Sequence, residues 1–149
     1  MQLDTLRLKG LLRFRDEVFV DLRDVPHGLI AIVAPNGAGK TTLLEASMGV
    51  LYRTFASRGD VLDYATGRDS FIEAQFSTGA AGTYRARLNL DGPKRASDAV
   101  LEQLAANGSR RVMNDGKVST YDQAIARVFP TKDVLLASAF AAQSKTGSF

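Results

Sequence analysis

The sequence predicts an α/β fold in which a mixed sheet and an antiparallel β-subdomain support a glycine-rich loop. Three observations point to it. Residues 28–33 form an unbroken apolar run, which is typical of a strand buried on both faces. A glycine-rich turn follows at residues 34–42, and a helical pattern with a wide apolar arc runs from residue 40 to about residue 55. Farther on, residues 72–77 and 84–91 alternate between apolar and polar side chains, as in a β-hairpin.

The glycine-rich turn reads Ala-Pro-Asn-Gly-Ala-Gly-Lys-Thr-Thr and has the composition of a phosphate-binding loop. Gly37 and Gly39 let the backbone curl so that successive amides face one point, and the following helix adds its free N–H groups. Lys40 is expected to reach the β- and γ-phosphates, and the Thr41 hydroxyl to ligate Mg²⁺. Ala34 replaces the first glycine of the usual pattern, which is tolerated if its φ angle stays negative.

Composition indicates one ordinary globular domain spanning residues 1–149. Hydrophobic residues make up 45% and charged residues 23% of the chain. The net charge of +3 suggests nucleic acid only weakly. The absence of cysteine excludes disulfides and thiolate chemistry, and it fits a cytoplasmic protein, which is the location we expect. The longest apolar stretch, residues 134–142, is less than half of the roughly 20 residues that span a bilayer, so we expect no membrane segment.

The remaining elements follow from local patterns. Alternation predicts strands near residues 3–12 and 18–22, with a polar connection between them and an irregular connection at residues 61–69. Residues 99–106 have a helical composition, but the Asn-Gly turn after them favours strand, turn and strand. Thr120 and Thr131 are positioned to cap two C-terminal helices.

The polar face of the predicted hairpin has two interpretations. Its side chains include Glu73, Arg85 and Arg87, which could meet DNA phosphates. Alternatively, Glu73 pairs with arginines across the strands on a solvated face, and this interpretation is preferred. His27 lies in a Pro-His-Gly turn, where a solvent-exposed role is expected.

The loop, its flanks and the tail together resemble a known family. Residues 8–22 and 28–46, the Leu-Leu-Glu-Ala continuation after the loop, and the tail at residues 137–143 are similar to SMC-like ATPases. The closest kind is the SbcC-type DNA repair ATPase, which partners a double-strand-break nuclease. The resemblance spans the whole chain but is weak between about residues 62 and 116. It implies the N-terminal lobe of an ABC-type ATPase head with a P-loop NTPase fold.

The resemblance also implies roles for individual residues. Thr42 would lie near the α-phosphate, Asn36 would face the γ-phosphate side across a head–head interface, and Gln143 would complete the Mg²⁺ and water geometry. Read alone, a glutamine after a helix is more often a surface residue. A basic residue after the first strand, Arg13 or Arg15, would approach the nucleotide. The expected cofactors are therefore ATP and Mg²⁺, and the expected cradle consists of Asn36, Gly37, Ala38, Gly39, Lys40, Thr41 and Thr42.

The sequence departs from the family by what it lacks. It contains no apolar strand that ends in Asp-Glu and no Ser-Gly-Gly signature loop, and residues 88–91 imitate the former poorly. Phosphoryl transfer depends on such parts as well as on the P-loop. The chain alone is therefore expected to bind ATP without hydrolysing it efficiently. It would need the C-terminal half of the head and a second head in a homodimer. DNA and a nuclease subunit are further partners that the resemblance implies.

Two alternative functions compete with this interpretation. One is the nucleotide-binding domain of an ABC transporter, but Lys40 and Gln143 lie 103 residues apart (143 minus 40), a long spacing for that class. The other is a scaffold whose loop no longer binds nucleotide, an idea that Ala34 supports.

Overall fold

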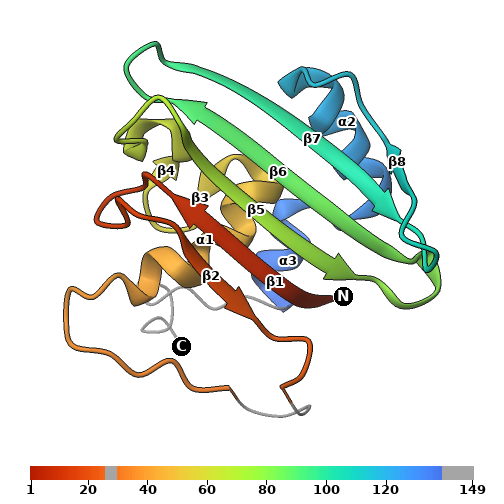
Figure 1. Ribbon diagram of the computed structural model, residues 1–149, viewed down its shortest axis with the longest axis horizontal. Coiled ribbons are helices and arrows are strands. Elements are labelled where there is room, and N and C mark those ends of the chain that lie inside the picture. Colours follow the sequence, from red (N-terminus) through yellow and green to blue (C-terminus); the bar gives the residue numbers. More distant parts are fainter. Residues whose placement is uncertain (26–29, 139–149) are drawn as a thin grey trace.

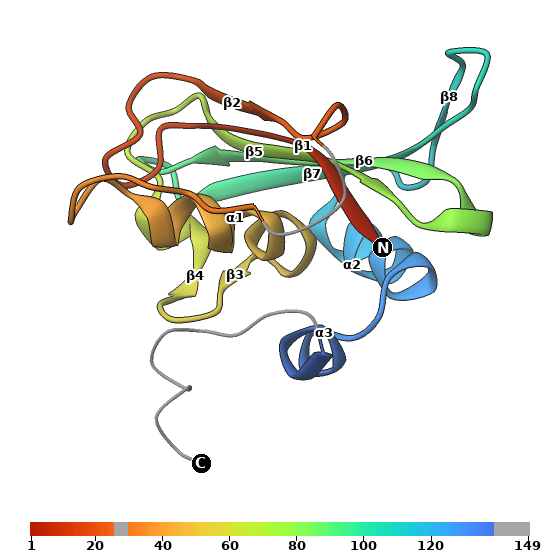
Figure 2. The ribbon, with the colours of Figure 1, turned by 90° about the horizontal axis from the view of Figure 1, so that it is seen from below.

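The computed structural model describes residues 1–25 and 30–138, which form one sheet covered on one face by helices (Figures 1 and 2). The sheet has six strands in the order β2-β1-β5-β6-β7-β8, and every neighbouring pair is antiparallel. Its strands are β1 (Gln2–Lys9), β2 (Val18–Asp21), β5 (Ser70–Ser77), β6 (Thr83–Asp91), β7 (Ala96–Leu104) and β8 (Arg110–Val112). A separate two-stranded ribbon pairs β3 (Thr54–Phe55) with β4 (Gly59–Asp60).

The central hairpin confirms the alternation seen in the sequence. Strands β5 and β6 pair in register, with Ile72 opposite Leu88 and Glu73 opposite Arg87. Along β6, buried and partly exposed residues alternate over the whole strand. One face of the sheet therefore carries the apolar core, and the other carries charged side chains. The connection between β5 and β6 includes the short 3₁₀ helix η2 (Gly79–Ala81).

The ambiguous stretch after this hairpin is a strand, as the turn residues indicated. The helical composition does not decide the structure, because β7 pairs with β6 along its whole length and this pairing satisfies the backbone groups on one edge of the strand. On the other edge, β8 pairs with residues 102–104. The Asn-Gly turn then returns the chain into β8, with the Ala105 amide donating to the Ser109 carbonyl at 2.9 Å.

The α-helices of the described residues lie on the apolar side of the sheet, with α1 (Lys40–Tyr52) and α2 (Val118–Val128) against it and α3 (Lys132–Ser138) farther from it, as Figure 2 shows. The 3₁₀ helix η1 (Val61–Tyr64) follows the small ribbon. Buried Met48 and Leu51 of α1, Tyr121 of α2 and Ile72 of β5 belong to one hydrophobic core. None of the helices within the described residues is long and apolar enough to cross a membrane.

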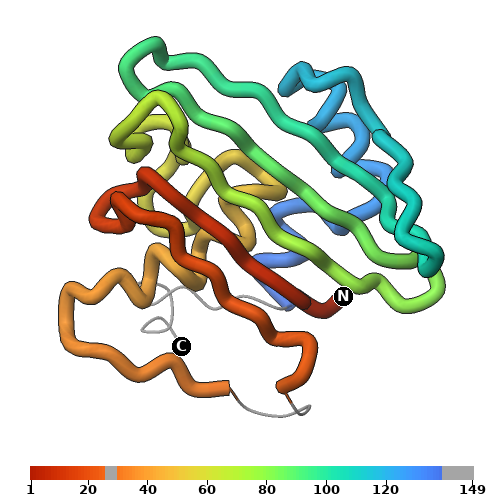
Figure 3. The backbone as a smooth tube through the Cα atoms, viewed as in Figure 1, coloured from red at the N-terminus to blue at the C-terminus, as the bar shows by residue number. Residues whose placement is uncertain are grey.

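The prediction of a buried strand at residues 29–33 is wrong for the part that the structure describes. Residues 30–34 have no regular secondary structure, and Figure 3 shows the backbone leaving the sheet before it enters α1. Ile30, Ile32 and Val33 are 49%, 41% and 91% exposed. A strand buried on both faces needs neighbours to pair with, and the described residues supply none at this position. The described sheet is therefore antiparallel throughout rather than mixed.

Two helix boundaries also differ from the expectation. Helix α1 ends at Tyr52 rather than near residue 55, because Arg53 adopts a left-handed conformation (φ 57°) and the chain turns into β3. Helix α2 begins at Val118, so Thr120 lies inside its first turn, where its hydroxyl bonds to Asp115 and the Lys117 carbonyl. The second predicted cap is confirmed, since the Thr131 hydroxyl accepts from the Val134 amide at 3.4 Å.

Candidate functional site

The glycine-rich loop bends where its glycines allow it to. Gly37 and Gly39 have φ angles of 76° and 96°, in the left-handed region that favours glycine. Gly39 is the N-cap residue of α1. Ala34 is not among the described residues with positive φ, so the alanine at the first position of the motif needs no strained backbone.

Packing restricts Gly39 as much as its backbone does. A Cβ atom built at this position would lie 2.6 Å from Cζ of Phe14 and 3.2 Å from Cδ of Arg13. The loop therefore rests directly on the connection that follows β1. This contact joins two segments that lie far apart in the sequence.

The N-terminus of α1 presents backbone donors to this loop. The first helical hydrogen bond runs from the Leu43 amide to the Gly39 carbonyl at 2.9 Å, so the amides of Lys40, Thr41 and Thr42 precede the helical ladder. No side-chain hydrogen bond caps this end of the helix. Together with the positive end of the helix dipole, these amides favour an anion at this position.

Lys40 lies folded over the loop. Its ammonium Nζ donates to the carbonyl oxygens of Ala34 at 2.6 Å and Pro35 at 3.0 Å. These neutral carbonyls hold the ammonium beside the loop, and no carboxylate of the described residues forms an ion pair with it. The charge is therefore available for a phosphate group.

A cavity of about 940 Å³ opens beside the loop and the start of α1. Of the residues that line it, three are cations, and none of the described ones is acidic, so its electrostatic character favours an anionic ligand. The lining residues are Leu12, Arg13, Asn36, Gly37, Gly39, Lys40, Thr41, Thr42, Arg58 and Thr66.

The cavity brings together most of the residues expected from the sequence. Between the two arginines left open, Arg13 lines the cavity and Arg15 does not. Ala38 is also outside the lining, and its amide closes the turn by donating to the Pro35 carbonyl at 3.1 Å. Gln143 and His27 lie outside the described residues, so their predicted roles stay predictions.

Arg58 is a cavity residue that the sequence analysis did not select. Its Nη1 donates to the Thr42 hydroxyl at 3.3 Å. It lies in a Ser-Arg-Gly-Asp stretch that reads only as a break after the helix. The β3–β4 ribbon folds this stretch back toward the start of α1, and such a return depends on tertiary structure rather than on a local motif.

The described residues offer too few ligand atoms to hold Mg²⁺ by themselves, so the ion would need a bound phosphate ligand as well. Among the described residues, no group of three His, Cys, Asp or Glu side chains could hold a metal. Thr41 contributes a single hydroxyl at the cavity wall. Mg²⁺ commonly binds through few protein oxygens plus substrate phosphates and waters, and this arrangement is compatible with that mode.

The weak imitation of an acidic strand end lies elsewhere. Asp91 ends β6 and lines a different, smaller cavity of about 330 Å³ together with Lys94 and Ser97. Its carboxylate accepts from the Lys94 amide at 3.0 Å, as a hairpin residue does. Asp91 is therefore no general base for the site at the loop.

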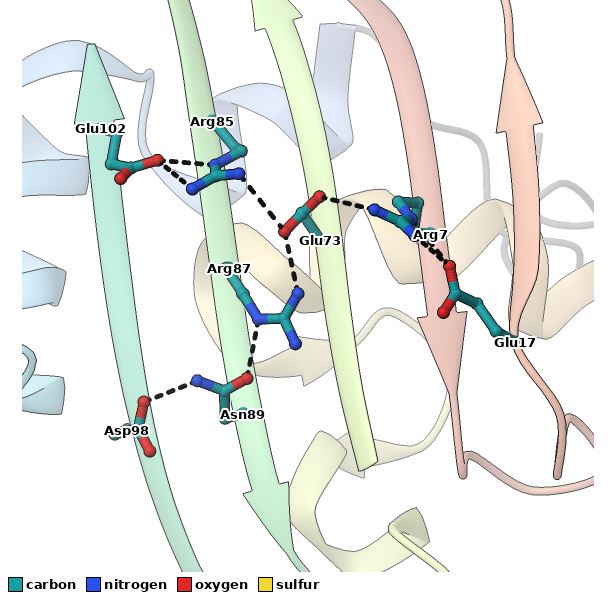
Figure 4. A network of polar contacts seen from close by, with 8 residues as sticks. All are labelled: Arg7, Glu17, Glu73, Arg85, Arg87, Asn89, Asp98 and Glu102. Carbon is teal, nitrogen blue, oxygen red and sulfur yellow. Dashed lines mark hydrogen bonds and ion pairs between the residues drawn. The ribbon is translucent and has the colours of Figure 1, made fainter. Parts of the chain in front are cut away.

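The charged face of the sheet favours the solvated interpretation over DNA contact. Glu73, whose side chain is 8% exposed, lies within 4.0 Å of the guanidinium groups of Arg7, Arg85 and Arg87 (Figure 4). Arg85 also bonds Glu102 at 2.6 Å. Arginines that already face carboxylates have little free charge for phosphates.

Comparison with known proteins agrees with this geometry. The family model described as an AAA domain matches residues 5–133, which is most of the chain. No curated protein matches the sequence.

Proposed function

Since the chain belongs to the AAA domain family, the N-terminal P-loop ATPase half typical of SbcC- and SMC-like proteins, we propose that it binds ATP in an SMC-like head. In this proposal the head acts in DNA double-strand-break repair or chromosome maintenance. Binding of ATP draws two heads together, and their engagement controls the access of DNA and a nuclease subunit.

One observation carries the proposal of ATP binding. A left-handed Gly39, the first amides of α1 and the Lys40 ammonium converge on one cation-rich cavity. Backbone donors and a point charge directed at one place match the chemistry of a phosphate chain. In the proposed complex, Arg13 and Asn36 contact the nucleotide from the wall of the cavity.

Magnesium enters the proposal with the nucleotide. When bound, Mg²⁺ neutralises charge on the β- and γ-phosphates. In the proposed site, Thr41 would contribute a hydroxyl ligand to Mg²⁺. Gln143 would complete the arrangement of ligands and water around the ion. Lys40 leaves the carbonyls of Ala34 and Pro35 and turns to the phosphate oxygens.

The proposal assigns hydrolysis to a larger assembly. The C-terminal half of the head supplies the carboxylates that the chain lacks, and a second head supplies the signature loop. The exposure of Ile30, Ile32 and Val33 supports the first part, because an apolar segment directly before a phosphate loop is expected to pair with further strands. Alone, the chain binds ATP and turns it over slowly or not at all.

Isothermal titration of the chain with ATP and magnesium tests the proposal. We expect saturable heat for the wild type and a loss of at least about 10-fold in affinity for Lys40→Ala, the scale of one charge-assisted contact. Lys94→Ala is the matched control, because Lys94 is 72% exposed on the β6–β7 turn and is not among the cavity-lining residues. Absence of binding by the wild type, or equal binding by the two variants, would contradict the proposal.

A further inference from the structure

A buried carboxylate lies behind the wall of the nucleotide cavity. Glu45, in the second turn of α1, is only 2% exposed. Its Oε1 atom accepts from the Ser57 amide at 2.8 Å. Its Oε2 atom is buried, and among the described residues no group hydrogen-bonds to it. A carboxyl oxygen buried without a hydrogen-bond donor is costly, so its retention at this place calls for a specific partner.

Within residues 1–25 and 30–138, the cation that pairs with this oxygen is Arg58. The guanidinium Nε lies 3.9 Å from Glu45 Oε2, beyond hydrogen-bond distance but well within the range of a strong charge interaction. The opposite end of the same guanidinium donates to the Thr42 hydroxyl at the cavity wall. Arg58 therefore spans the distance between the buried carboxylate and the cavity.

The two contacts of Glu45 act on one turn. Oε1 holds the backbone at Ser57, and Oε2 attracts the side chain of the next residue, Arg58. Without the carboxylate, a long arginine on an exposed turn would sample many rotamers, and ordering it would cost side-chain entropy on binding. With it, the guanidinium is already directed at the cavity.

We propose that Glu45 is a positioning residue of the nucleotide site, which holds the turn at residues 57–60 so that Arg58 faces the phosphate groups of the ligand. This inference rests on the proposed binding of ATP. It extends the site from the glycine-rich loop to a second segment. It also assigns a task to the acidic member of the Leu-Leu-Glu-Ala sequence, which contacts no ligand itself.

A double-mutant cycle on nucleotide affinity tests the inference. Glu45→Gln keeps an oxygen for the Ser57 amide but removes the charge that faces Arg58. We expect Glu45→Gln and Arg58→Ala each to weaken binding of Mg-ATP by about 5- to 10-fold, the scale of one lost charged contact. The double variant should bind no more weakly than Arg58→Ala alone, because Glu45 acts through Arg58. Affinity for AMP, which lacks the outer phosphates, should change less than 2-fold in every variant.

Arg110→Ala, at an exposed position on the edge strand β8, controls for the loss of one positive charge. A thermal melt of each variant separates positioning from simple destabilisation. Glu45 would be merely structural if Glu45→Gln lowered the melting temperature and weakened ATP and AMP equally, or if its effect persisted in the Arg58→Ala background. Wild-type binding with an unaffected Glu45→Gln variant would overturn only this inference. No binding by the wild type would overturn the proposed function and the inference together.

Discussion

Gly39 combines two constraints that are usually separate. Its φ angle of 96° disfavours any side chain, and the ring of Phe14 occupies the space that a Cβ atom would take. The first constraint could be foreseen from the motif. The second follows from the packing of the connection after β1 against the loop, which no local pattern reveals.

We expect Gly39→Ala to destabilise the protein by about 1–3 kcal/mol, the usual cost of a non-glycine residue in such a conformation, with a further cost from the clash. Mg-ATP affinity should fall as well, because the loop must shift away from Phe14. Urea denaturation and isothermal titration measure the two effects.

Gly116→Ala is the matched control for this variant. Its φ angle of 90° resembles that of Gly39, but no atom lies within 4 Å of the position of its Cβ. It should share the backbone cost and leave nucleotide affinity unchanged. If the two variants lost equal stability and bound ATP equally well, the contact with Phe14 would affect neither stability nor nucleotide binding.

At the scale of elements, a buried hydrogen bond helps to join the end of α1 to α2. The Tyr121 hydroxyl, fully buried, donates to the Val50 carbonyl at 2.6 Å. Carbonyls in the last turn of a helix have no partner within the helix. The phenol therefore satisfies a buried acceptor and fixes α2 against the helix that carries the site.

The same burial gives a pH dependence. Burial raises the pKa of Tyr121 well above its ordinary value of 10.0, whereas the denatured chain releases the phenol proton near that value. The contribution of Tyr121 to the free energy of unfolding is therefore fully present below pH 10 and is lost as the pH rises above this value. Tyr121→Phe should cost about 1–3 kcal/mol at pH 7 and a smaller amount at pH 11. Urea denaturation at both pH values measures this, and a constant difference would contradict it.

The ion-pair network on the open face of the sheet offers a second element-scale prediction. Glu73→Gln should destabilise the protein by about 2 kcal/mol, because three arginines around a nearly buried position lose their shared carboxylate. Glu17→Gln is the control, since Glu17 also pairs with Arg7 but its side chain is 40% exposed. Its cost should be less than about 1 kcal/mol. Equal costs in denaturant melts would show that burial does not govern this network.

At the scale of the whole molecule, the sequence predicted those features that depend on interactions between residues close together in the chain. The β5–β6 hairpin follows from strict alternation, and the bend of the loop follows from Gly37 and Gly39. The prediction of a strand before the loop was wrong for the described residues. An apolar run indicates that a segment tends to be buried, but it does not show whether neighbouring strands are present to pair with it. Arg58 was missed because it reaches the cavity through the β3–β4 ribbon.

The segment directly before the glycine-rich loop exposes apolar side chains to solvent. Val33 is 91% exposed, next to Ile32 at 41%. Val112 on β8 is 57% exposed and offers an equivalent side chain at the edge of the sheet. Contiguous exposed apolar residues mark interaction sites or drive association, whereas single ones are common on surfaces.

We expect the isolated chain to associate as its concentration rises, and Val33→Asp to reduce this association several-fold, because a charge there disfavours contact between apolar segments. Val112→Asp should change it little. Size-exclusion chromatography with light scattering over a range of concentrations measures the effect. In the proposed head, the same Val33→Asp change should block assembly with the C-terminal half, because the segment would pair there as a strand. If Val33→Asp associated and assembled as the wild type does, residues 30–33 would be an exposed connection rather than an unpaired strand.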